Sequence, residues 1–327
     1  MPAAPLKKLS HASLQEAAQW YVQLHDHGAS DQQRQHWQAW LAASGEHQDA
    51  WRYVERVSQR FAPLQSDAGQ QAASHALRSS PRGSTRRQAL SSLLVLGGAS
   101  LLGWSAWRAG LPDSLQRLSA DLATGTGQTR ETVLSDGSRI WLNALSALDV
   151  RFSPAQRLLR LHLGEVLIDT AKDPLRPFLV HTEHGQLRAL GTRFSVRQEQ
   201  GRTLLNVFAG AVEVRTARGQ VQVIDSGQQV AFDANGLHPQ SAATPAREAW
   251  RHGVLLADNL PLGQLLAELS RYRPGHLGCD PAVAAMPVMG SFPLRDTDQA
   301  LALLQAALPI QVETTLPWWV SVGPKRG

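Results

Sequence analysis

The sequence has a single cysteine, Cys279, among its 327 residues. One cysteine cannot form an intramolecular disulfide, and its isolation excludes both CxxC redox motifs and cysteine-based zinc sites. Charged residues are also scarce, at 18% of the chain, whereas 43% of the residues are hydrophobic. This balance excludes a wholly disordered chain, and the length predicts two or three domains.

The sequence also lacks a basic domain, although its net charge is +5. Acidic residues are absent from residues 68–108, which carry five arginines and therefore most of the positive excess. Residues 1–67 have six basic and seven acidic residues, and residues 109–327 have 21 and 20. Because a DNA-binding head usually concentrates Lys and Arg on one face, this distribution argues against direct binding of nucleic acid.

Long uncharged apolar runs are absent except for one, the segment from Ala89 to Trp107. A helix of this length would reach roughly 28 Å, close to the thickness of the hydrocarbon core of a bilayer. More arginines precede the run than follow it, and Arg86 and Arg87 lie just before it. The positive-inside rule then predicts a single-pass protein of the inner membrane, with its N-terminus cytoplasmic and its C-terminus periplasmic. The alternatives are a buried core helix for the run and a twin-arginine export signal for the two arginines.

The pattern over residues 1–67 predicts a small bundle of three short helices. Ser13 and Glu16 have the spacing of a capping box, and Ser30 is placed to cap the second helix. Four tryptophans lie in this head, namely Trp20, Trp37, Trp40 and Trp51. A bundle of this size cannot easily bury four indoles completely, so we expect at least one to be partly exposed and to anchor a protein partner.

Residues 68–88 are rich in small and polar residues, which predicts a flexible basic linker. From residue 118 to residue 240 the apolar period changes to two, and glycines recur every few residues. Many short strands separated by glycine turns predict an all-β sandwich or roll. Asp136-Gly137 marks a hairpin turn, and one strand is expected on each side of Gly164.

Residues 250–327 mix the two periods and predict a compact α+β module, with helices beginning near Pro261 and near Asp296. Paired catalytic carboxylates, a Ser/His/Asp spacing and a glycine-rich phosphate loop are all missing, so we expect neither an enzyme site nor a cofactor. His181 and His184 are expected at the surface, near a turn. A metal site is not expected in the head, because its histidines two residues apart point to different sides of a helix.

A set of motifs carries a resemblance that covers nearly the whole chain. The head contributes Ala17-Ala-x-Trp20-Tyr-x-x-Leu24, Trp37-x-x-Trp40 and Ala50-Trp51-x-x-Val54. The β region contributes Leu134-x-Asp-Gly-Ser138, Leu142-Asn143, Gly164-Glu165-Val166, Leu190-Gly-Thr-x-Phe-x-Val196 and Gly210-x-Val-x-Val214. In this order around one predicted span, they resemble the FecR-like transmembrane anti-sigma factors of cell-surface signalling. The terminal module looks like the short N-terminal domain of secretins and TonB-dependent receptors.

The resemblance implies a signalling mechanism. The head, with its four tryptophans, would bind an extracytoplasmic-function (ECF) sigma factor and keep it from RNA polymerase. The terminal module would contact the signalling domain of a TonB-dependent outer-membrane siderophore receptor. Membrane proteases would then release the head with its sigma factor. The alternative is a membrane-anchored, DNA-binding transcription regulator with a periplasmic sensor domain.

The resemblance also implies one site of covalent chemistry, because some family members cleave themselves within the Leu-Gly-Thr motif. Here the bond would be Gly191-Thr192. The Thr192 hydroxyl would attack the Gly191 carbonyl and exchange the amide for an ester, which water then hydrolyses. Glycine would allow the unusual backbone that this step needs. The simpler interpretation is a turn glycine followed by a β-branched strand residue.

Overall fold

The computed structural model describes residues 9–25, 30–65, 120–199 and 201–325. Contacts divide the chain into two compact units. The first unit combines the N-terminal part with residues 275–284 and 309–327, and the second combines residues 110–274 with 285–308. The C-terminal region therefore contributes elements to both units.

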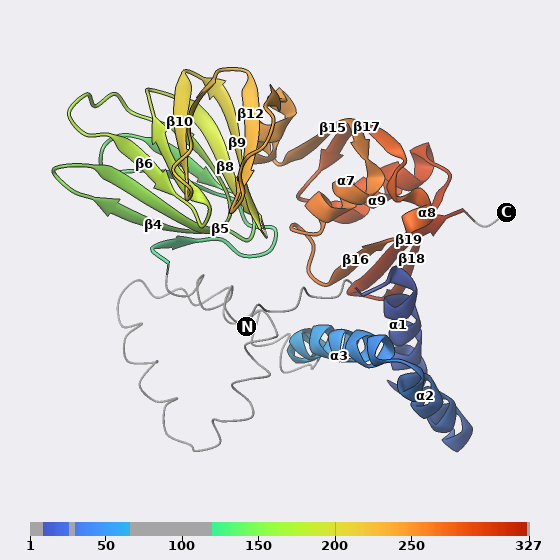
Figure 1. The fold of residues 1–327 in the computed structure, drawn as a ribbon. Helices are drawn as coiled ribbons and strands as arrows, with labels where there is room; N and C mark the ends of the chain where they lie inside the picture. The colour runs from blue at the N-terminus through green and yellow to red at the C-terminus, as the bar shows by residue number, and fades with distance from the viewer. Residues whose placement is uncertain (1–8, 26–29, 66–119, 200, 326–327) are drawn as a thin grey trace, which may run out of the picture. The chain divides into compact units, whose positions relative to one another are not determined.

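Three helices form the head, as predicted: α1 (His11–His25), α2 (Asp31–Ala43) and α3 (Gly45–Gln65) (Figure 1). The predicted cap of α2 is confirmed, because the Ser30 hydroxyl accepts a hydrogen bond from the backbone N–H of Gln33, whose side chain bonds back to Ser30. The predicted cap at Ser13 is wrong. Helix α1 begins at His11, and the Ser10 hydroxyl accepts the Ser13 N–H at 3.2 Å.

The first unit also contains a three-stranded sheet from the C-terminal part of the chain. Its elements are β16 (His276–Cys279), α8 (Pro281–Ala284), β18 (Ile310–Leu316) and β19 (Trp319–Pro324). The strand order is β16-β19-β18, and β19 pairs parallel with β16 and antiparallel with β18. Central β19 places the Trp319 side chain in a fully buried position.

The second unit is built around a large β domain, which confirms the predicted all-β region (Figure 1). Its strands are β1 (Leu122–Ala123), β2 (Arg130–Val133), β3 (Arg139–Leu142), β4 (Ala147–Phe152), β5 (Arg157–Asp169), β6 (Phe178–His181), β7 (Gly185–Ala189), β8 (Arg193–Glu199), β9 (Arg202–Ala209), β10 (Ala211–Thr216), β11 (Val221–Asp225), β12 (Gln228–Asp233), β13 (Gly236–Leu237) and β14 (Ser241–Ala242). The path through the sheet is β11-β10-β7-β6-β5-β8-β9-β12-β13.

The long strand β5 joins two halves of this domain. Its first half pairs with β4 and β6, and its second half pairs with β3 and β8. The prediction of two strands separated at Gly164 is wrong, because the chain stays extended through this residue. A Cβ at Gly164 would lie 2.3 Å from the Ser146 Oγ, so the glycine permits a close approach of the residue that precedes β4 and does not end the strand.

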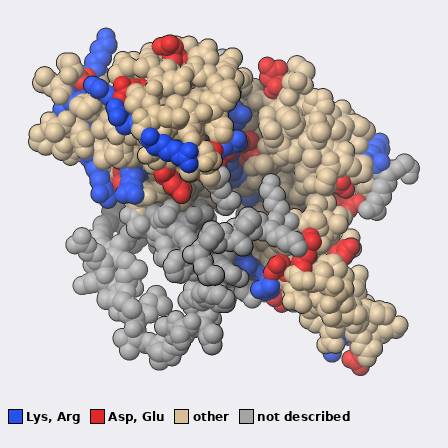
Figure 2. Space-filling model, in the orientation of Figure 1, with Lys and Arg blue, Asp and Glu red and all other residues tan. Residues whose placement is uncertain are grey.

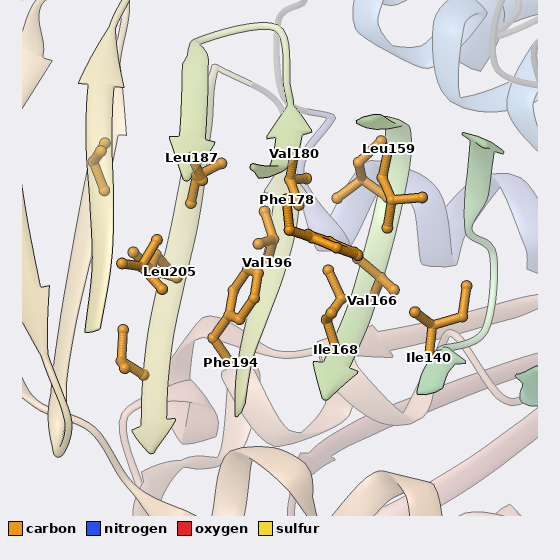
Figure 3. Close-up of a cluster of buried hydrophobic side chains, with 14 of the residues drawn as sticks. Ile140, Leu159, Val166, Ile168, Phe178, Val180, Leu187, Phe194, Val196 and Leu205 are labelled. Carbon is orange, nitrogen blue, oxygen red and sulfur yellow. The ribbon is translucent and has the colours of Figure 1, made fainter. Parts of the chain in front are cut away.

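The hydrophobic core of the β domain lies between the two halves (Figure 3). Ile140 and Phe194 come from one half, Leu159 and Phe178 come from the other, and all four are at most 1% exposed. Burying each such side chain contributes about 1.5–3 kcal/mol. This shared core fixes β7 and β8, and therefore the short link between them.

Five more elements complete the second unit: η1 (Pro245–His252), β15 (Val254–Pro261), α7 (Leu262–Leu269), β17 (Pro287–Pro293) and α9 (Thr297–Ala307). Strands β15 and β17 form an antiparallel pair. The predicted starts of both helices are confirmed, since α7 follows Pro261 directly and the Asp296 side chain caps α9 by accepting the Gln299 N–H at 2.8 Å.

The predicted transmembrane helix, and with it the single-pass inner-membrane localisation, is corrected by the structure. Within the part of the chain that the structure describes, no helix is both long and apolar enough to cross a bilayer. The longest of these helices, α3, has 21 residues but carries charged side chains along its length, including Asp49, Arg52 and Arg56. The run Ala89–Trp107, with Arg86 and Arg87, lies outside the described residues.

Candidate functional site

The Gly191-Thr192 bond lies in the three-residue link between β7 and β8. Strand β7 belongs to the half that contains β6 and β10, whereas β8 pairs with β5 and β9 in the other half. The link is therefore the place where the chain crosses from one half of the domain to the other. The Leu190 N–H anchors its start by donating to the Ala211 carbonyl at 3.1 Å.

The backbone at this crossing depends on two glycines. Gly191 has a φ of +84° and Gly210 a φ of +75°, both in the left-handed region that favours glycine. A Cβ at Gly210 would lie 2.4 Å from the Gly191 carbonyl oxygen. Gly210 thus permits the close approach of the β9–β10 turn to the bond that the sequence motif marks.

The Thr192 side chain carries a buried hydroxyl group. The residue is only 4% exposed, and its hydroxyl oxygen has no hydrogen-bond partner among the described residues. An unpaired buried hydroxyl costs about 1–3 kcal/mol, so such a group calls for a physical explanation. The neighbouring Gly191 is exposed, so water reaches the other side of the same bond.

Thr170 holds the backbone on both sides of the Thr192 α-carbon. Its hydroxyl accepts the Thr192 N–H at 2.9 Å and donates to the Thr192 carbonyl at 3.1 Å, and its own N–H donates to that carbonyl at 3.1 Å. Among the described residues the Thr192 hydroxyl therefore has no hydrogen-bond partner, whereas the peptide groups around it are fixed. No motif in the sequence pointed to Thr170, because it lies 22 residues away and reaches the link only through the pairing of β5 with β8.

A hollow of about 680 Å³ adjoins the link on its outer side, lined by the 170–177 loop and by Gly191. Buried Arg157 holds this loop in place, since its guanidinium bonds to the Asp136 carboxylate at 2.9 Å and to the Ala171 and Arg176 carbonyls. Burial raises the pKa of Asp136, but hydrogen bonds from Ser138 and Arg157 outweigh it and leave that pKa below its usual value.

The four tryptophans of the head occupy two kinds of environment. Trp51 is buried, with its ring centroid 5.0 Å from that of Trp37, whereas Trp20, Trp37 and Trp40 are each half-buried. Trp40 stacks on His47 and donates its indole N–H to a carboxylate oxygen of α1 at 2.7 Å. The expected partial exposure is confirmed, and the role of these side chains in binding stays a prediction.

A buried polar network ties the end of α7 to the β domain. Asn143 donates to the Glu165 carboxylate at 2.8 Å and accepts the hydroxyl hydrogen of Tyr272. Arg271 lies 3.4 Å from Glu165 and donates to the Ala144 carbonyl at 2.7 Å. The Leu142-Asn143 and Gly164-Glu165 motifs were visible in the sequence, but nothing there indicated their partners, Arg271 and Tyr272, in the turn after α7.

A second ion pair extends this network, between Arg197 on β8 and Glu268 on α7. Burial raises the pKa of Glu268, but the charges of Arg197 and Arg271 outweigh that effect and hold it below its ordinary value.

The predicted surface position of His184 is wrong. This histidine is 5% exposed rather than at the surface, with its Nδ1 3.0 Å from the Thr203 hydroxyl, because β9 covers the turn that carries it.

Two family models match this chain. Residues 120–213 match the FecR protein family, and residues 15–57 match DUF4880, a domain of unknown function. No curated protein matches the chain.

Solved structures match 62% of the chain. A crystal structure at 1.65 Å of a "putative anti-sigma factor" from Parabacteroides distasonis ATCC 8503 is 22% identical, with a TM-score of 0.54, and the match covers 62% of this chain and 98% of that one. A second crystal structure with the same description, at 2.50 Å, is 22% identical with a TM-score of 0.53, and covers 62% and 96%. At this identity the likeness shows a shared fold. Together with the two family matches, it confirms the resemblance found in the motifs: residues 120–213 of the chain form a FecR domain.

Proposed function

We propose that this FecR-like protein is an anti-sigma factor whose helical head sequesters an ECF sigma factor. The observation that carries the proposal is the presence, in one chain, of the FecR match at residues 120–213 and the DUF4880 match at residues 15–57. The structures described as an anti-sigma factor, which share its fold, support the same role. Three half-buried indoles on a small helical domain suit a surface that closes over an apolar patch of a protein partner.

The finer part of the proposal concerns the signal. A TonB-dependent siderophore receptor would signal through its own signalling domain to the C-terminal part of this chain, residues 250–327, and proteolysis would then free the head with its sigma factor. The support for this step is the resemblance of these residues to the short N-terminal domain of secretins and receptors. Their described elements, alternating short strands and helices, agree with such a module.

Charge argues against the rival function, in which the head binds DNA. Residues 1–67 carry six basic and seven acidic residues. On the face shown in Figure 2, the surface over α2 and α3 is mostly neutral, with few Lys or Arg side chains. A DNA-binding surface needs several cationic contacts with phosphate groups.

Co-purification tests the sigma-factor proposal. The full chain is expressed with each of several ECF sigma factors and captured through an affinity tag, and we expect one sigma factor to be retained. Trp37→Ala should weaken that retention, whereas Trp141→Ala, a half-buried tryptophan of the β domain, should leave it unchanged. The proposal fails if no sigma factor is retained, and the rival gains if the chain alone retards promoter DNA.

We also propose that the protein cleaves itself between Gly191 and Thr192. The Thr192 oxygen bonds to the Gly191 carbonyl carbon, its proton passes to the Thr192 nitrogen, and the C–N bond breaks to leave an ester and an amine. Water then adds to the ester carbon, the C–O bond breaks, and Gly191 keeps a carboxylate. The unpaired buried hydroxyl of Thr192 beside an exposed glycine supports this step.

Intact-mass measurement tests self-cleavage. Purified protein should contain two fragments, residues 1–191 and 192–327, and the second should begin with Thr192. Thr192→Ala should stay whole, and Thr203→Ala, which removes another buried hydroxyl of the same domain, should still be cut. Equal cleavage of the Thr192→Ala protein would overturn the proposal.

A further inference from the structure

The geometry around Thr192 separates the nucleophile from the groups that orient it. No described group holds the Thr192 hydroxyl, so its approach to the Gly191 carbonyl is set by the backbone. That backbone is fixed by one side chain, because the Thr170 hydroxyl lies 2.9 Å from the Thr192 nitrogen and 3.1 Å from the Thr192 carbonyl oxygen. Of these two atoms, the nitrogen belongs to the bond that would break.

The nitrogen of the breaking bond changes its character during the acyl shift. In the amide it is planar and donates its N–H, and in the ester intermediate it is an amine that has gained a proton. A hydroxyl is suited to both states, because it accepts from the amide N–H and can rotate to donate to the amine. The position of the Thr170 hydroxyl therefore suits the nitrogen before and after the bond breaks.

We propose that Thr170 is a positioning residue for the amide-to-ester shift, an inference that rests on the proposed self-cleavage. Its hydroxyl holds the Gly191-Thr192 peptide group so that the Thr192 oxygen faces the Gly191 carbonyl carbon. The bond that forms is Thr192 Oγ to Gly191 carbon, the bond that breaks is Gly191 carbon to Thr192 nitrogen, and the hydroxyl proton of Thr192 ends on that nitrogen. Thr170 gains and loses no proton overall.

Thr170 is itself held rigidly, as a positioning group must be. It directly follows β5, whose last residue, Asp169, pairs with Arg193 of β8. The next residue, Ala171, donates its N–H to the Ser138 hydroxyl at 2.9 Å, and its carbonyl accepts from buried Arg157 at 3.0 Å. Thr170 is therefore held by the sheet on its N-terminal side and, on its C-terminal side, by Ala171, which buried Arg157 fixes together with its ion-pair partner Asp136.

The test compares three full-length variants with the wild-type protein in a time course of cleavage. Thr170→Val removes the hydroxyl at nearly constant shape, Thr170→Ser keeps it, and Thr203→Val removes a buried hydroxyl elsewhere in the β domain. We expect Thr170→Val to slow cleavage about 100-fold, because a loss of orientation is worth that much. The cleavage rates of Thr170→Ser and Thr203→Val should stay within about threefold of wild type, since both variants keep a hydroxyl at residue 170 that can bond to the Thr192 backbone.

Treatment with hydroxylamine shows whether the ester has formed, and so distinguishes a positioning role in the amide-to-ester shift from a merely structural role. At neutral pH it cleaves esters far faster than peptide bonds, so it speeds cleavage at Gly191-Thr192 only in a protein in which the ester has already formed. We expect no rescue of Thr170→Val by hydroxylamine, because the shift itself is slow. If this variant does not fold, which circular dichroism shows, Thr170→Ala takes its place with the same readouts.

Three outcomes overturn the role of Thr170. They are cleavage of Thr170→Val at the wild-type rate, rapid hydroxylamine cleavage of that variant, and a Thr170→Ser protein that is as slow as Thr170→Val. Failure of self-cleavage itself looks different, because the folded wild-type protein would then remain whole with and without hydroxylamine.

Discussion

Two glycines decide whether the chain can cross from β7 to β8, and they do so for different reasons. Space is open around the Cβ position of Gly191, so only its φ of +84° opposes a side chain there. Gly210 is restricted by both its φ and its surroundings, because a Cβ would meet the Gly191 carbonyl oxygen at 2.4 Å. Both residues fall in motifs that were recognisable in the sequence, but only the structure shows that they contact one another.

Gly210→Ala should therefore destabilise the β domain and disturb the cleavage site. We expect a loss of about 1–3 kcal/mol beyond the cost of the positive φ alone, as for other overpacked sites. Gly219→Ala is the matched control, because its φ of +82° is similar and nothing lies within 4 Å of its Cβ position. Urea unfolding in the uncut Thr192→Ala background measures both. Equal losses in the two variants would contradict a close contact at Gly210.

The buried pair of Asp136 and Arg157 should make stability depend on pH. The pKa of Asp136 in the folded protein lies below its usual value of 3.8, so the stabilisation is complete well above pH 3.8 and is lost as pH falls through the lower, folded pKa. Asp136→Asn should lose this acid-dependent part and destabilise the protein by about 3–5 kcal/mol near neutral pH, because it leaves the Arg157 charge unpaired.

Unfolding at a series of pH values measures this contribution. The exposed Asp225 supplies the control, since Asp225→Asn removes a carboxylate without leaving a buried charge unpaired. Parallel profiles for wild type and Asp136→Asn below pH 4 would show that the buried pair does not carry the dependence.

At the scale of elements, the strand-rich character of residues 118–240 was predictable, because apolar residues recur with a period of two and glycines recur between the strands. Strand β4 alternates apolar Leu148, Val150 and Phe152 with polar residues, but Asp149 is buried as well, so its alternation does not indicate which side chains are buried. Strand β7 was missed because only Leu187 of its five residues is buried, which leaves almost no apolar signal.

The polar network after α7 ties this helix to the β domain, so we expect the stability of the second unit to depend on it. Arg271→Met should destabilise the second unit by about 3–5 kcal/mol, because it leaves buried Glu165 without its cation. Arg202→Met removes an arginine from an exposed pair with Glu199 and should cost at most about 1 kcal/mol. Denaturant unfolding of both variants in the Thr192→Ala background compares the two. Similar small losses in the free energy of unfolding for both variants would show that the network does not stabilise the packing of α7 on the β domain.

At the scale of the whole molecule, the sequence could place the candidate bond but not its surroundings. The Leu-Gly-Thr motif located Gly191 and Thr192 because it is local in the chain. Thr170 and Gly210 reach the bond only after β5 pairs with β8 and the β9–β10 turn closes over the link. Contacts of this kind depend on tertiary pairing, which a pattern of residues along one chain does not encode locally.

The strand order predicts what happens after the chain is cut. Residues 1–191 retain β5 and β7, residues 192–327 retain β8 and β10, and the pairs β5–β8 and β7–β10 each join one fragment to the other. The fragments also share one hydrophobic core. We expect them to elute together in size-exclusion chromatography and to separate only in denaturant. Separate elution in native buffer would contradict the observed pairing.

The central claim, that the protein keeps a sigma factor from RNA polymerase, is tested most directly by competition in solution. A fluorescent ECF sigma factor is bound to core polymerase, and its anisotropy is followed as the full chain is added. The account predicts that the chain displaces the sigma factor and that Trp37→Ala needs more protein to do so than Trp141→Ala. A sigma–polymerase complex that is unaffected by saturating chain, for every ECF sigma factor that co-purifies with it, would contradict the account.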